Sequence, residues 1–96
     1  MRKWISREEE AELPEFESFE DAWEFFEKRY GKDVVLESVE FINEKKCYFC
    51  GLIIDWESYN EMVRLFEAGE PVIGMKYLEC KQPIQIFEDG SVHIVH

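Results

Sequence analysis

The stretch CYFCGLII, from Cys47 to Ile54, is a run of eight consecutive apolar residues. A short apolar run without polar alternation predicts a central strand that is buried on both faces. The run is too short to cross a bilayer, which takes about 20 apolar residues. We therefore expect the fold to form around this strand.

The segment before this stretch predicts a neighbouring strand. Residues 43–46, Asn-Glu-Lys-Lys, indicate a turn, and residues 32–42 are rich in strand-forming side chains. The apolar phase of this earlier segment shifts between Leu36 and Val39, which predicts a β-bulge. The chain is expected to run through this strand, turn, and return as the buried strand.

Residues 18–31 predict the clearest helix of the chain. Ser18 is placed to cap its start and Gly31 to end it. Spacing at about 100° per residue predicts an apolar stripe that faces the core; its members are Phe19, Ala22, Trp23, Phe26 and Tyr30. Glu20, Asp21, Glu24 and Glu27 fall on the other side. Phe25 lies off the stripe, beside these carboxylates.

The second half of the chain predicts another helix and three strands. Asp55 or Ser58 is expected to cap a helix over residues 56–68 that Gly69 ends, with an inward stripe of Trp56, Tyr59, Val63 and Phe66. Residues 72–80 read as a strand. A last hairpin with the loop 88–90 is predicted to pair Ile86 with Val92 and Ile84 with Ile94, which leaves His93 on the solvent side.

Together these elements predict an α+β fold: an antiparallel or mixed sheet of four to five short strands with two amphipathic helices packed on it. Residues 18–96 are expected to form this single domain. Residues 1–17 form an acidic, partly ordered lead-in, in which Ser6 and Glu9 have the spacing of a capping box. The chain shows no cationic start followed by an apolar stretch, so we expect a cytoplasmic protein without a secretory signal.

The charge of the chain bears on its partners. Its 22 acidic and 11 basic residues give a net charge of −11. Residues 8–27 hold ten carboxylates and no cation. Nucleic acid and anionic membranes repel such a surface, so neither is expected as a direct partner. A basic protein surface would be attracted, although a solvated face that keeps the protein soluble is the simpler interpretation of the same charges.

Three cysteines, Cys47, Cys50 and Cys80, leave one alternative open. The spacing of Cys47 and Cys50 resembles one knuckle of a zinc ribbon, and Cys80 with His93 or His96 would complete four ligands. No second short-spaced pair accompanies the first, and cysteines within a buried strand act as small apolar residues. The sequence therefore favours core packing, with no metal and no cofactor, over a zinc-stabilised structural or adaptor domain.

The sequence holds no motif for catalysis. It has no glycine-rich phosphate loop, no His-x-x-x-His and no Gly-x-Ser-x-Gly, so an enzyme is not expected. The leading hypothesis is a small acidic interaction module that binds a protein with a basic surface through Glu20, Glu24, Phe25 and Glu27. In size and charge, but in no motif, it resembles inhibitor, immunity and antitoxin proteins. A second alternative is a phage or defence-system inhibitor that mimics nucleic acid, because Glu20 and Glu24 are about 6 Å apart along a helix.

Overall fold

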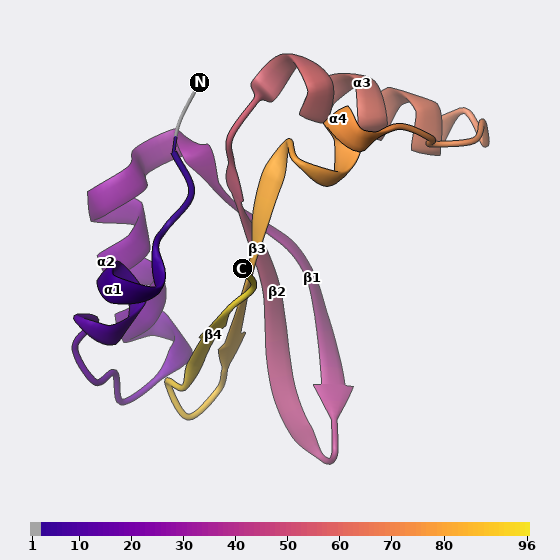
Figure 1. The fold of residues 1–96 in the computed structure, drawn as a ribbon. Coiled ribbons are helices and arrows are strands. Elements are labelled where there is room, and N and C mark those ends of the chain that lie inside the picture. Colours follow the sequence, from indigo (N-terminus) through magenta and orange to yellow (C-terminus); the bar gives the residue numbers. More distant parts are fainter. Residues whose placement is uncertain (1–2) are drawn as a thin grey trace.

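The computed structural model describes residues 3–96 and shows an α+β fold around one four-stranded antiparallel sheet (Figure 1). The strands lie in chain order and are β1 (Val34–Ile42), β2 (Lys45–Ile53), β3 (Lys81–Phe87) and β4 (Val92–Ile94). The helices are α1 (Arg7–Ala11), α2 (Phe19–Tyr30), α3 (Trp56–Glu67) and α4 (Met75–Leu78), with a 3₁₀ turn at Gly31–Asp33. The predicted fold class is confirmed.

Strand β2 is a central strand of the sheet, as the apolar run predicts. It pairs with β1 on one side and β3 on the other, and Cys50 to Ile53 are buried. The turn before it is tighter than the predicted one, because Asn43 and Glu44 alone form it. Both residues have left-handed backbone angles, with φ of 51° and 68°. Two such residues fit a tight hairpin, so β2 begins at Lys45.

The predicted bulge in β1 is also confirmed. The register of β1 against β2 shifts between Leu36 and Ser38. Because of this extra residue, Leu36 and Val39 lie on the same face of the sheet, opposite Cys50 and Tyr48. The shift explains why the apolar pattern changes phase at this point in the sequence.

The β3–β4 hairpin adopts the register that the apolar pattern selects. Ile84 pairs with Ile94 and Ile86 with Val92, and His93 is exposed. Gly90 has a φ of +93°, which favours glycine. A β-carbon at this position would lie 2.1 Å from the carbonyl oxygen of Phe16. The hairpin therefore packs against the lead-in more closely than any other residue type would permit.

Helix α2 covers one face of the sheet and supplies the centre of the core. The Ser18 hydroxyl accepts a hydrogen bond from the Asp21 amide, and Gly31 ends the helix, as predicted. Phe26 and Ala22 are fully buried. The other members of the stripe are half-buried at its margin. Among them, Phe19 stacks on Tyr48 of β2 with ring centroids 3.6 Å apart.

The lead-in is fastened to the sheet by backbone as well as side-chain contacts. Ser6 and Glu9 form the predicted capping box at the start of α1. Ile5 is buried in the core. The buried Gln82 amide accepts a hydrogen bond from the Ile5 amide (2.6 Å) and donates one to the Ile5 carbonyl (3.0 Å). This pairing satisfies a buried polar side chain and fixes the path of the chain before α1.

Two expectations for the second half of the chain are wrong. Residues 72–80 do not form a strand: a loop leads through Gly74, with a φ of +136°, into the short helix α4. Helix α3 has the predicted cap at Asp55, but Phe66 is 78% exposed. The reason is visible in Figure 1, where α3 projects past the end of the sheet and only α4 lies beside its outer part. A hollow lined by Phe66 and Glu37 separates this end of α3 from the sheet.

Candidate interaction surfaces

Three of the four predicted site residues form one exposed face of α2. Glu20, Glu24 and Glu27 are exposed and lie within roughly 60° of one another around the helix axis, at about 100° per residue. The buried side of the helix, with Phe26 and Ala22, fixes this orientation. The structure therefore presents these three carboxylates together to solvent.

The fourth residue, Phe25, lies on a different flank of α2. It is roughly 140° around the helix from Glu20 and is half-buried. Its ring packs against Phe16 of the lead-in at 5.4 Å and edge-on against Phe26 at 5.6 Å, and the Arg29 guanidinium lies 5.8 Å from its centroid. Phe25 is thus partly used inside the protein, and it does not form a compact face with the three glutamates.

Few cations neutralise the acidic lobe, which we define as residues 7–30. Lys28 forms an ion pair with Glu24 at 2.7 Å, and its hydrogen bond lowers the pKa of that carboxyl. Arg29 reaches Glu9 at 4.0 Å. Within the described part of the chain, Glu20, Asp21 and Glu27 have no ion-pair partner. This surface keeps a strong negative potential.

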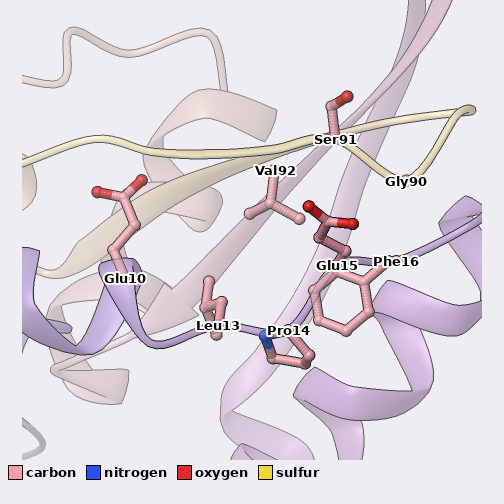
Figure 2. Close-up of a pocket in the computed structure, with 8 residues that line it drawn as sticks. All are labelled: Glu10, Leu13, Pro14, Glu15, Phe16, Gly90, Ser91 and Val92. Carbon is pink, nitrogen blue, oxygen red and sulfur yellow. The ribbon is translucent and has the colours of Figure 1, made fainter.

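The acidic lobe also contains a hollow of about 400 Å³ where the lead-in faces the β3–β4 hairpin (Figure 2). Leu13, Phe16 and Val92 contribute apolar surface, and the carboxylates of Glu10 and Glu15 lie beside it. An apolar wall with carboxylates at its edge suits a lysine or arginine side chain, which has an apolar stem and a cationic head.

Glu10 joins this hollow to the edge of the sheet. Its carboxylate accepts a hydrogen bond from the Ile94 amide at 3.1 Å and lies 2.7 Å from His96 Nε2. The hydrogen bond with His96 and then that with Ile94 lower the pKa of Glu10 against the opposing effect of desolvation. Glu10 thus accepts a hydrogen bond from a backbone amide on the outer edge of β4. Glu15 lies at the same hollow and has no ion-pair partner among residues 3–96.

The cysteines do not assemble into a site. Cys47 and Cys50 are three residues apart in one strand, so their side chains point to opposite faces of the sheet. Burial raises the pKa of Cys50 to about 12 and also raises the pKa of Cys47 and Cys80. Within residues 3–96, no group of three histidine, cysteine or acidic side chains is placed to hold a metal ion. The zinc alternative gains no support from this geometry.

Sequence reasoning missed a second surface, which we call the apolar lobe: α3, the connection 68–74 and α4. Its outer side exposes large apolar side chains, namely Phe66, Val72, Ile73, Met75 and Leu78. The apolar residues of segment 72–80 predict a buried strand, so they are not expected at the surface. The usable signal was Pro71 and Gly74 around Val72 and Ile73, since both residue types interrupt regular structure.

Comparisons with known proteins identify no relative: no protein family, no curated protein and no solved structure matches the chain. None of the helices in residues 3–96 is long and apolar enough to cross a membrane.

Proposed function

We propose that the protein is a non-enzymatic interaction module that binds a basic surface of another protein through its acidic lobe, as an inhibitor or immunity protein does. The observation that carries the proposal is the exposed carboxylate face of α2, on which Glu20 and Glu27 have no ion-pair partner among residues 3–96. Helix α2 is anchored by a fully buried Phe26, so this face is held rigidly by the core.

Binding would proceed in two stages. The net charge of −11 attracts a basic partner over distances of about 8–10 Å at physiological salt, which raises the association rate. Short-range contacts then hold the complex. The hollow beside Glu10 and Glu15 would receive a lysine or arginine side chain of the partner, and the exposed part of Phe25 would pack at the margin.

The experiment compares two variants that change the net charge equally. In the first, Glu20, Glu24 and Glu27 become glutamine. In the second, Glu40, Glu44 and Glu57, which are exposed on β1, the β1–β2 turn and the start of α3, become glutamine. Each variant raises the net charge from −11 to −8. Partner captured from host lysate is then bound to each variant at low and high salt, and association and dissociation rates are measured.

The α2 variant should associate about 10-fold more slowly at low salt and lose most of its salt dependence, with little change in dissociation rate. In the control variant, the decrease in association rate and in salt dependence should be less than half as large. Equal losses in both variants would mean that only overall charge matters, which would refute a site on α2. Displacement of the protein from its partner by duplex DNA would favour the alternative of nucleic-acid mimicry.

A further inference from the structure

The apolar lobe exposes a group of large apolar side chains to solvent. Ile73 is 81% exposed, Leu78 71% and Met75 64%. Isolated exposed apolar side chains are common, but a contiguous group indicates an interaction site. These residues lie on two consecutive segments, the connection to α4 and α4 itself, so they are neighbours in the chain and in space.

Two hollows of about 460 Å³ each lie in this surface. The first lies between α3 and the sheet, and Phe66 and Val63 line it. The second lies along α4, and Ile73 and Leu78 line it. Met62 and Val72 line both, so the two hollows are adjacent. Two apolar side chains of one ligand segment would fill them.

The charges around the lobe select the chemistry of its ligand. Among residues 3–96, Glu67, which lines the first hollow, and Glu70 and Glu79, which flank the exposed segment, have no ion-pair partner. The nearby cations are already engaged or turned away. Lys76 pairs with Glu61 at 3.0 Å and Lys81 with Glu37 at 2.6 Å. Arg64 lies roughly 160° around α3 from Met62, away from the hollows, but only about 60° from Glu67.

We infer that the apolar lobe binds a basic amphipathic segment of a partner protein, with two apolar side chains in the hollows and lysine or arginine side chains beside Glu67, Glu70 and Glu79. The inference rests on the proposed function for the class of partner, a basic protein, and adds a second surface to the acidic lobe. Binding of an amphipathic segment in an apolar groove is a common mode of peptide recognition.

Other occupants fit less well. A second copy would bring another net charge of −11 and the same carboxylate rim against the first, which repels it. The lead-in of the chain itself is packed at the opposite part of the sheet, where Ile5 and Phe16 contact the core and the β3–β4 hairpin.

The test uses the full chain and three synthetic peptides. The first peptide is amphipathic and made of leucine and lysine, the second has the same composition in scrambled order, and the third keeps the apolar pattern with glutamate in place of lysine. Peptide affinity is measured by fluorescence anisotropy, and backbone amide NMR shifts locate the site. The lobe variant carries Phe66→Ser and Ile73→Ser, which are exposed positions, so folding should be unaffected.

Two controls separate this inference from the proposed function. Phe41→Ser changes a 74% exposed phenylalanine beside the β1–β2 turn, and this turn lies at the opposite end of the sheet from α3 and α4 (Figure 1). The α2 glutamine variant removes the acidic face. We expect the amphipathic lysine peptide to bind the lobe variant at least 10-fold more weakly than it binds the unaltered protein. Its affinity for Phe41→Ser should stay within about twofold of its affinity for the unaltered protein. The scrambled and glutamate peptides should bind at least 10-fold more weakly to the unaltered protein.

Each other outcome refutes the inference. Unchanged affinity in the lobe variant, or shifts confined to α1 and α2, would place peptide binding on the acidic lobe and leave the proposed function standing. If the glutamate peptide bound as tightly as the lysine peptide, the ligand of the apolar lobe would not need to be basic. A dimer in analytical ultracentrifugation that becomes a monomer in the lobe variant would mean that a second copy covers this surface.

Discussion

Equivalent phenylalanines on the two amphipathic helices of this protein differ in burial. Phe26 on α2 is fully buried, whereas Phe66 on α3 is 78% exposed, although both lie on the apolar stripe of a capped 12-residue helix. The difference lies in what each helix faces. Helix α2 lies across the sheet, while α3 projects past its end (Figure 1). A periodic stripe therefore predicts a buried face only where a second layer lies opposite.

The two regions also differ in how their connections are fastened. The lead-in before α2 is tied to the sheet by Gln82, Glu10 and the close approach of Gly90. On the other side, α4 is tied to α3 by hydrogen bonds from Tyr77 and Lys76 to the Glu61 carboxylate at 2.8 Å and 3.0 Å. The first set includes the buried Gln82 and Gly90, whereas in the second the Lys76 bond is exposed and the Tyr77 bond is only partly buried. We expect the acidic lobe to unfold with the sheet and the apolar lobe to loosen earlier.

The largest expected difference between the two regions is in the phenylalanines themselves. Phe26→Ala leaves a cavity in the core and should lower the free energy of unfolding by about 3–5 kcal/mol. Phe66→Ala should change it by no more than about 0.5 kcal/mol, because the side chain is already in water. Urea denaturation followed by tryptophan fluorescence measures both. Similar losses in the two variants would show that α3 is as much part of the core as α2.

A second pair of substitutions compares two left-handed glycines. Gly90→Ala puts a β-carbon 2.1 Å from the Phe16 carbonyl at a φ of +93°, and should lower the free energy of unfolding by about 2–4 kcal/mol. Gly69 has a similar φ of +72°, but nothing lies within 4 Å of an added β-carbon. Gly69→Ala should lower it by only about 1 kcal/mol. Thermal and urea denaturation measure both losses. Equal losses of unfolding free energy in the two variants would contradict the close packing of the lead-in against Gly90.

The smallest effect concerns the carboxylate that fastens the lead-in. The pKa of Glu10 is lowered in the folded protein, so its contribution to stability is present above its ordinary value of 4.5 and is lost as the pH falls through the lowered pKa. Glu10→Gln should lower the free energy of unfolding at pH 7 by about 0.5–1 kcal/mol and should remove part of the stability loss below pH 4.5.

Two glutamates serve as controls for this experiment. Glu12→Gln alters an exposed carboxylate of the same segment that has no ion-pair partner among residues 3–96, and its stability at pH 7 should match the parent. Glu61→Gln should speed amide hydrogen exchange in α4 without shifting the urea midpoint, because the hydrogen bonds of Glu61 to Lys76 and Tyr77 hold α4 against α3. Stability measured from pH 3 to 7 that falls identically in the parent and in Glu10→Gln would show that Glu10 does not fasten the lead-in.

Local sequence patterns predict much of the fold because several of its elements are specified by neighbouring residues. The Ser18 cap and Gly31 stop define α2, the phase shift at Leu36 marks the bulge, and Gly90 with the apolar pattern selects one hairpin register. For the candidate site, spacing along α2 correctly predicts that Glu20, Glu24 and Glu27 share an exposed face. Each of these features depends on period and backbone geometry, which a short segment determines alone.

Only the tertiary structure decides what lies opposite each apolar surface. The half-burial of Phe25 depends on Phe16, nine residues away, and the hollow beside Glu10 depends on a hairpin near the other end of the chain. The segment 72–80 has strand-like composition, but its residues 75–78 form α4 and contact α3 instead of extending the sheet at β1 or β4. Burial and pairing are long-range properties, so the sequence determined which residues are apolar or charged, and the packing of distant elements decided which of them face a partner.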